Sequence, residues 1–213
     1  VLLVIVRRAY IAQFRDTLQA GEIQRDVALP ALDADSIARL TESLASPDEV
    51  EALAALELVA RYRGVPALVF YHPSHAVVRR ALALLDGELR LDVARVLEHL
   101  LGHGEPKIRA AALAASVRTG GPRQRLVAAL DDPDPEPRAM AVVGLAHAGD
   151  DVTERIAALA EGPPATRLAL AEAIGFLPDR RFRHTLAGLL ASGDAAVMQQ
   201  VLHVWAHDPG LAD

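Results

Sequence analysis

The chain has 213 residues, no cysteine and a formal net charge of −6 at pH 7. The lack of cysteine excludes disulfides, thiolate nucleophiles and cysteine-ligated metal sites. The acidic balance argues against a general nucleic-acid binder, because such proteins gather Lys and Arg against the phosphates. Apolar residues make up 52% of the chain but aromatic residues only 4%, so few bulky binding anchors are expected.

The N-terminal segment opens with the apolar residues 1–6, followed directly by Arg7 and Arg8. Six residues cannot cross a bilayer, which needs about 20, and a signal peptide places its charges before the apolar run. Two interpretations remain for residues 1–8. They are the last turns of a membrane helix with the arginines on the cytoplasmic side, or a terminal helix packed against the rest of the chain.

Apolar spacing predicts one helix over residues 2–20, because Tyr10, Phe14 and Leu18 follow each other at four-residue intervals. Residues 22–33 contain a proline and alternate weakly, so we expect a loop or short hairpin. The sequence therefore predicts a first unit, 1–33, made of an N-terminal helix and a connecting loop.

A short sequence motif then recurs at near-constant spacing. Each copy begins with a proline-containing turn and continues with an arginine and several small residues, and the successive arginines are 30, 29 and 29 residues apart. These arginines are Arg79, Arg109, Arg138 and Arg167. A fixed period of this size is typical of a solenoid, in which each unit buries its apolar face by stacking on its neighbours.

Turn and cap signals divide residues 34–213 into six predicted helix pairs. The pairs are 35–45 with 48–63, 65–71 with 75–86, 90–101 with 106–118, 122–131 with 135–148, 151–161 with 164–177, and 180–191 with 194–207. The second helix of several pairs is rich in alanine, which lets helices approach closely and suits an inner layer.

Residues 36–207 resemble HEAT and HEAT-like (phycobilisome-lyase type) repeats. The resemblance rests on the turn Pro and Asp residues, the Val-Arg or Ile-Arg step and the small residues after it. It implies an all-α fold, namely a right-handed α-solenoid of about six HEAT-like helix pairs with an extra N-terminal helix. The last pair has Met198 where arginine is expected, and such divergence is typical of a capping repeat.

Residues 1–85 resemble the junction between the last membrane helix and the HEAT repeats in bacterial nucleotide-translocase-like transporter fusions. The stretches that carry this resemblance are 7–16, 21–23 and 40–48. It implies a cytoplasmic domain at the inner face of the cell membrane, with a membrane domain before Val1 and, in many such fusions, a cyclic-nucleotide-binding domain after Asp213. No transport residue is carried over.

The repeated arginines are interpreted first as structural. Each guanidinium is expected to reach a carboxylate in a turn between helices, such as Asp132 or Asp134, because the planar fork of arginine satisfies a carboxylate with two bonds. The alternative is a stripe of arginines that binds anions or contacts a partner.

Two histidine pairs have the i, i+4 spacing that can place two imidazoles on one helix face: His99 with His103, and His203 with His207. Neither pair has the Glu of a His-Glu-x-x-His motif, so no metal site is predicted. Trp205, the single tryptophan, is expected to cover the end of the core or, if exposed, to act as a docking anchor.

The sequence contains no nucleophile motif, no P-loop and no dinucleotide-binding motif. We therefore expect a non-catalytic protein-interaction or regulatory module that uses no cofactor. Its partner is expected to be a protein or an adjacent domain of the same polypeptide. The alternatives are an enzyme built on HEAT-like repeats, such as a bilin lyase or a DNA glycosylase, and a free soluble scaffold.

Overall fold

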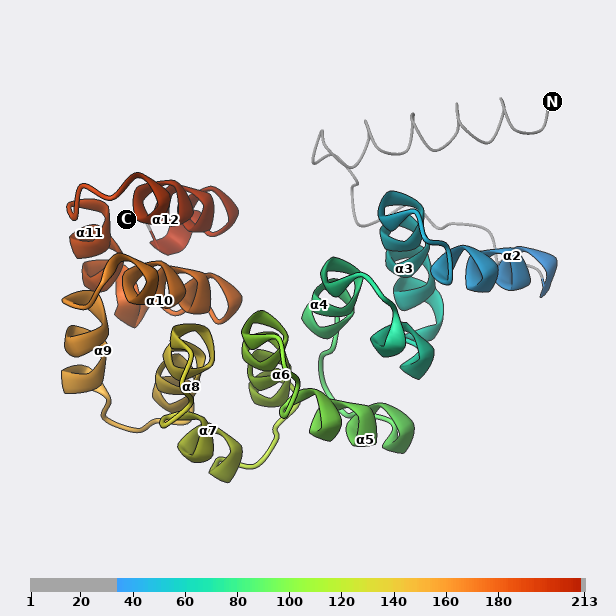
Figure 1. The fold of residues 1–213 in the computed structure, drawn as a ribbon, viewed down its shortest axis with the longest axis horizontal. Coiled ribbons are helices and arrows are strands. Elements are labelled where there is room, and N and C mark those ends of the chain that lie inside the picture. Colours follow the sequence, from blue (N-terminus) through green and yellow to red (C-terminus); the bar gives the residue numbers. More distant parts are fainter. Residues whose placement is uncertain (1–33, 212–213) are drawn as a thin grey trace.

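The computed structural model describes residues 34–211 (Figure 1), and all regular structure within this range is helical. The predicted all-α class is therefore confirmed for these residues. The α-helices are α2 (Ala34–Leu44), α3 (Glu49–Arg63), α4 (His75–Ala83), α5 (Leu91–Leu100), α6 (Pro106–Arg118), α7 (Gln124–Ala129), α8 (Pro135–His147), α9 (Thr153–Ala160), α10 (Pro164–Phe176), α11 (Arg183–Leu190) and α12 (Ala195–His207). The 3₁₀ helices are η1 (Ala67–Tyr71), η2 (Arg180–Phe182) and η3 (Pro209–Leu211).

The predicted helix pairs match these elements closely, with two differences in type. The helix predicted over 180–191 begins as the 3₁₀ helix η2 and continues as α11. The segment predicted as a helix over 65–71 is the 3₁₀ helix η1, which follows Pro66 and is held by a bond from the Val69 amide to the Pro66 carbonyl. Two prolines, Pro66 and Pro73, leave too few residues between them for an α-helix of ordinary length. The helix predicted over 2–20 and the loop over 22–33 lie outside the described residues.

Local signals set the helix starts. The Asp48 carboxylate accepts hydrogen bonds from the amides of Val50 and Glu51, and Asp194 caps α12 in the same way. The first residue of α6, α8 and α10 is proline, whose missing N–H is not needed at that position. A short turn that ends in proline therefore precedes each of these three helices.

The helices form two layers along an arc (Figure 1). Helices α4, α6, α8, α10 and α12 pack each against the next and form what we call the inner row. Helices α5, α7, α9 and α11 lie on the outer side of the arc, each packed on its following inner helix. None of the described helices has both the length and the apolar composition needed to cross a membrane.

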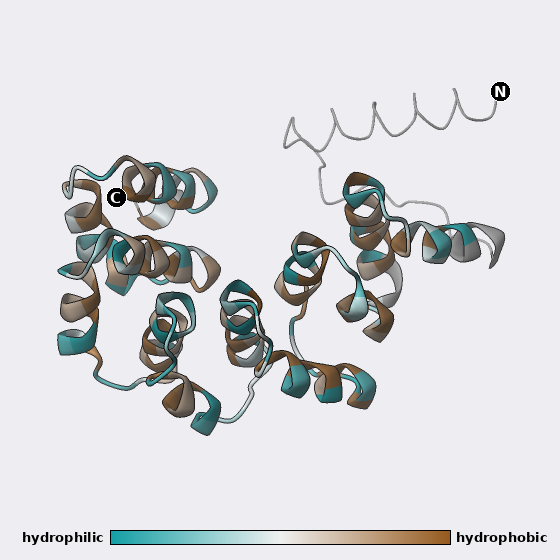
Figure 2. Cartoon of the chain, viewed as in Figure 1, coloured by the Kyte–Doolittle hydropathy of each residue, from teal (hydrophilic) through white to brown (hydrophobic). Residues whose placement is uncertain are grey.

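The core lies between the two layers and between successive inner helices. In Figure 2 the helices carry hydrophobic and hydrophilic residues side by side, as expected of helices with one buried and one exposed face. Small residues allow the inner helices to approach closely, since a Cβ added at Gly175 of α10 would lie 2.8 Å from Val204 Cγ2 of α12. This packing explains why a core with few aromatic residues is still closely filled.

Two glycines, one in a turn and one within helix α11, test how tightly the chain is packed at each place. Gly121 donates its amide to the Ser116 carbonyl at 2.7 Å, and a Cβ there would overlap Ser116 Oγ and lie 2.8 Å from that carbonyl oxygen. Gly121→Ala is expected to lower the free energy of unfolding by about 2 kcal/mol. Gly188→Ala, in the exposed part of α11 with no heavy atom within 4 Å of a new Cβ, is expected to raise it by about 0.5–1 kcal/mol. Urea unfolding measures both, and equal signs would contradict the described packing.

Candidate functional site

The inner row encloses a pocket of about 180 Å³, which we call the inner groove. Side chains from all five inner helices line it. The polar and aromatic ones are Arg79 of α4, Lys107 of α6, Glu136 of α8, Glu172 and Phe176 of α10, and Gln200 and His203 of α12. Because α4 and α12 are the two ends of the row and line one pocket, the inner groove lies on the concave side of the arc (Figure 1).

Two side chains of opposite charge that line the inner groove lie close together. Lys107 Nζ lies 3.8 Å from Glu172 Oε1, and the Glu172 side chain is 27% exposed. Burial raises the pKa of Glu172, and the nearby Glu136 raises it further, whereas the positive charges of Lys107 and Arg79 lower it; the net direction is upward. The carboxylate is therefore only partly paired, and a donor group from a bound molecule would stabilise it.

An apolar surface adjoins these charges. Phe176, at the end of α10, is 36% exposed and contributes to the inner groove and to a neighbouring pocket of about 340 Å³. His203 and Gln200 of α12 also line both pockets. The inner groove thus combines an exposed aromatic ring with charged and amide groups, which is the mixture found in sites that bind polypeptide segments.

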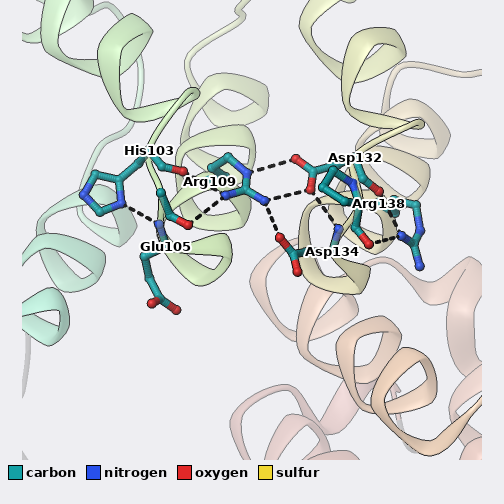
Figure 3. Close-up of polar contacts among 8 residues, drawn as sticks. His103, Glu105, Arg109, Asp132, Asp134 and Arg138 are labelled. Carbon is teal, nitrogen blue, oxygen red and sulfur yellow. Dashed lines mark hydrogen bonds and ion pairs between the residues drawn. The ribbon is translucent and has the colours of Figure 1, made fainter.

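The repeated arginines lie at the turns rather than together in a site. Arg109 donates from Nε and Nη2 to the two carboxylate oxygens of Asp132 at 2.9 and 2.8 Å, and from Nη2 to Asp134 Oδ2 at 2.7 Å (Figure 3). It also donates from Nη1 to the carbonyl of His103 at 2.8 Å. The predicted contact with turn carboxylates is therefore confirmed for Arg109, which joins its own turn to the next one.

The other three arginines differ from that prediction. Arg138 donates to the carbonyls of Asp132 and Pro133 in its own turn, at 2.8 and 2.7 Å, and the following turn has Pro163, which carries no carboxylate, at the N-cap. The Nε atoms of Arg79 and Arg167 are buried and have no hydrogen-bond partner among the described residues. Among residues 34–211, the expected hydrogen bonds to turn carboxylates are therefore formed by Arg109 and not by the other three arginines.

Trp205 packs against the core as a partly buried side chain. Its Nε1 is buried without a hydrogen-bond partner in the described part of the chain, so the indole nitrogen is not available to a docking partner. The large apolar residues that α12 exposes are instead Met198 and Leu202.

One histidine of each pair contacts neighbouring protein groups. The ring of His103 packs edge-on against His75, with ring centroids 5.6 Å apart, and accepts the Glu105 amide at Nδ1. The His203 and His207 rings lie 4.2 Å apart, and His207 Nδ1 is 2.9 Å from the His203 carbonyl. Within residues 34–211 no three His, Asp or Glu side chains are grouped to hold a metal ion.

The sequence did not reveal the inner groove, although it held a signal for it. Lys107 and Glu136 both stand two residues after a helix N-cap, at equivalent places in consecutive repeats. A charged residue at this position in both repeats indicates a second polar column beside the arginines. Glu172 and Phe176 lie on the exposed flank of α10 and have no counterpart that the period alone would identify.

Comparison with known proteins assigns neither a family nor a function to the chain. No protein-family model matches the chain, and no curated protein matches it.

Proposed function

We propose that the chain is a non-catalytic HEAT-like protein-interaction module, built as a right-handed α-solenoid of about six helix pairs. The repeated turn, the inner row and the outer helices support this proposal, because such proteins stack helix pairs and bind partners along an extended concave surface. The inner groove is the binding surface.

The observation that carries this proposal is the composition of the inner groove. Phe176 offers an aromatic ring that is partly exposed, while Glu172 and Lys107 offer charges of both signs that are only partly satisfied by each other. A protein segment with one apolar anchor and flanking polar groups satisfies all three. Binding energy in such interfaces is concentrated in a few aromatic and charged residues.

The experiment compares two exposed apolar side chains of similar accessibility. Phe176 is 36% exposed in the inner groove, and Val127 is 40% exposed on the outer helix α7. Wild type, Phe176→Ala and Val127→Ala are immobilised, and proteins retained from a lysate of the source cells are identified by mass spectrometry. The expected result is a protein that binds wild type and Val127→Ala, with affinity for Phe176→Ala reduced at least about tenfold.

Equal retention of every protein by Phe176→Ala and Val127→Ala would overturn the inner groove as the binding surface. Calorimetry with the purified partner then checks the difference in Kd. Both substitutions are on the surface, so the circular-dichroism spectra of the three proteins are expected to coincide.

Within this proposal, the chain is the cytoplasmic domain of a nucleotide-translocase-like membrane transporter and couples the transporter to a regulatory domain. The resemblance of residues 1–85 supports this assignment. Sequencing the native gene upstream of the Val1 codon tests it. An open reading frame that encodes hydrophobic segments of membrane-spanning length supports a transporter, and a start codon directly upstream overturns it.

A further inference from the structure

Arg79 stands one residue out of register with the other repeated arginines. Counted from the first residue of its helix, Arg79 is the fifth residue of α4, whereas each of the other three is the fourth residue of its helix. The fourth residue of α4 is Val78, which is 3% exposed in the core. One residue turns the direction of a side chain by about 100° around the helix axis, so Arg79 leaves its helix in a different direction from the other three.

This shift brings Arg79 into the inner groove. Arg109 binds the carboxylates of the next turn. Of the four repeated arginines, all of which the structure describes, Arg79 alone lines the inner groove. It lies there with Lys107 and with two glutamates, Glu136 and Glu172. The first helix of the inner row therefore contributes a cation to the concave side of the arc.

The guanidinium of Arg79 is left without a bonded partner. Its Nε is buried, and no hydrogen bond or ion pair joins Arg79 to another residue within 34–211. Burial raises the pKa of Glu172, whereas the positive charges of Lys107 and Arg79 lower it, so Arg79 and Glu172 lie near each other without a direct bond. An arginine that is partly buried and unpaired gains most from a planar acceptor that takes two of its hydrogen bonds.

The other charges of the inner groove favour a carboxylate over a phosphate as this acceptor. Glu136 and Glu172 line the same pocket as Arg79 and Lys107. A phosphate group carries a charge of about −1.5 to −2 at pH 7, so both glutamates would repel it strongly. A carboxylate carries a single negative charge, which the two cations together outweigh, and its planar shape matches the arginine fork.

The dimensions of the inner groove favour a polypeptide segment over a small molecule. At about 180 Å³, the groove is smaller than the clefts of about 300–1,000 Å³ that enclose small-molecule ligands. It continues past Phe176 and His203 into the neighbouring pocket of about 340 Å³. A segment that runs through both pockets places single side chains in each of them and does not end in the inner groove.

We propose that the inner groove selects partner segments that carry an Asp or Glu side chain beside an apolar residue. Arg79 binds the carboxylate, Lys107 adds to its attraction, and Phe176 packs against the apolar residue. This inference rests on the protein-interaction function proposed above and adds the chemistry of the partner to it. Since Arg79 makes no bond to another described residue, its role is in binding rather than in the fold.

Random peptides displayed inside a phage coat protein, so that their C-termini are not free, test the proposal. They are selected on wild type, on Arg79→Gln and on Arg80→Gln. Arg80 is the matched control, because it follows Arg79 in α4 but is 47% exposed and paired with Glu57 of α3, outside the inner groove. Wild type and Arg80→Gln are expected to enrich peptides that combine an apolar residue with Asp or Glu. Arg79→Gln is expected to lose the preference for the acidic residue.

Calorimetry with one enriched peptide measures the contact itself. Replacing its Asp or Glu by the corresponding amide leaves the protein unchanged and is expected to weaken binding to wild type about tenfold. The same replacement is expected to have little effect on binding to Arg79→Gln, because the two changes remove one interaction. The urea midpoint of Arg79→Gln is expected to match that of wild type, since the substitution breaks no bond within the described fold.

The outcomes separate this inference from the proposed function. Enriched peptides that need Phe176 but show no preference for Asp or Glu overturn the inference and leave the inner groove as a binding surface. An acidic preference that Arg79→Gln retains also overturns it. If no enriched peptide loses affinity for Phe176→Ala, both the inference and the proposed binding surface are overturned.

Discussion

Arg109→Met is expected to lower the free energy of unfolding by about 2–4 kcal/mol. The Arg109 and Asp132 side chains are only 13% and 14% exposed, and the guanidinium joins two turns through Asp132, Asp134 and the His103 carbonyl. Methionine keeps the length of the side chain but leaves the Asp132 carboxylate partly buried without its main partner. The cost is therefore that of an uncompensated charge rather than of lost packing.

Arg123→Met is the matched control. Arg123 also binds a single carboxylate with two bonds, to Asp150 at 2.9 and 2.8 Å, but its side chain is 57% exposed. Water already solvates this pair, so the loss of the Arg123 side chain is expected to change the free energy of unfolding far less than the loss of Arg109. Urea unfolding at pH 7 compares the two variants, and a cost for Arg123→Met equal to that for Arg109→Met would contradict this explanation.

The pH dependence of the same variant gives an independent check. Burial alone would raise the pKa of Asp132, but the hydrogen bonds from Arg109 and from the Asp134 amide outweigh it and lower the pKa below the usual value. A carboxyl group with a lowered pKa stabilises the fold above its unfolded pKa, and this contribution is lost as the pH falls through the folded pKa. The difference in urea midpoint between wild type and Arg109→Met is therefore expected to shrink between pH 7 and pH 3.

The fold of the described residues could be predicted because its determinants are local. Proline after a turn, capping by Asp48 and Asp194, and runs of apolar residues at helical spacing all act within a few positions of the chain. These local signals predicted the first and last residues of the helices to within a few positions. One exception, η1, arises where two nearby prolines shorten a segment whose composition is otherwise helical.

The inner groove could not be predicted in the same way, because it depends on how five helices meet. Arg79 and His203 are 124 residues apart in the chain yet line one pocket, and no spacing rule relates them. The arginine period was visible, but whether each arginine finds a carboxylate depends on the next turn. Asp132 and Asp134 serve Arg109, whereas the turn that follows Arg138 has Pro163 at its N-cap.

Two phenylalanines near the C-terminal repeat are expected to separate stability from binding. Phe182, in η2, is 1% exposed and belongs to the core with Leu186 and Leu189. Phe182→Ala removes most of this side chain from a closed site, and it is expected to cost about 3–5 kcal/mol. If the alanine variant does not fold, Phe182→Leu, which leaves a smaller cavity, is expected to cost about 1–2 kcal/mol.

Phe176→Ala is expected to cost at most about 1.5 kcal/mol, because more than a third of the ring already meets water and the space left behind opens into the inner groove. Thermal and urea unfolding of both variants measure the contrast. The fully buried Phe182 stabilises the fold. Phe176 is exposed beside Glu172 and Lys107, so its removal changes the free energy of unfolding little and its ring is available to a partner. Phe176→Ala should therefore lose partner binding while it keeps its fold, and Phe182→Ala or Phe182→Leu should lose binding only in proportion to the unfolded fraction. A Phe176→Ala protein as unstable as Phe182→Ala would place that ring in the core and remove the basis for a binding surface there.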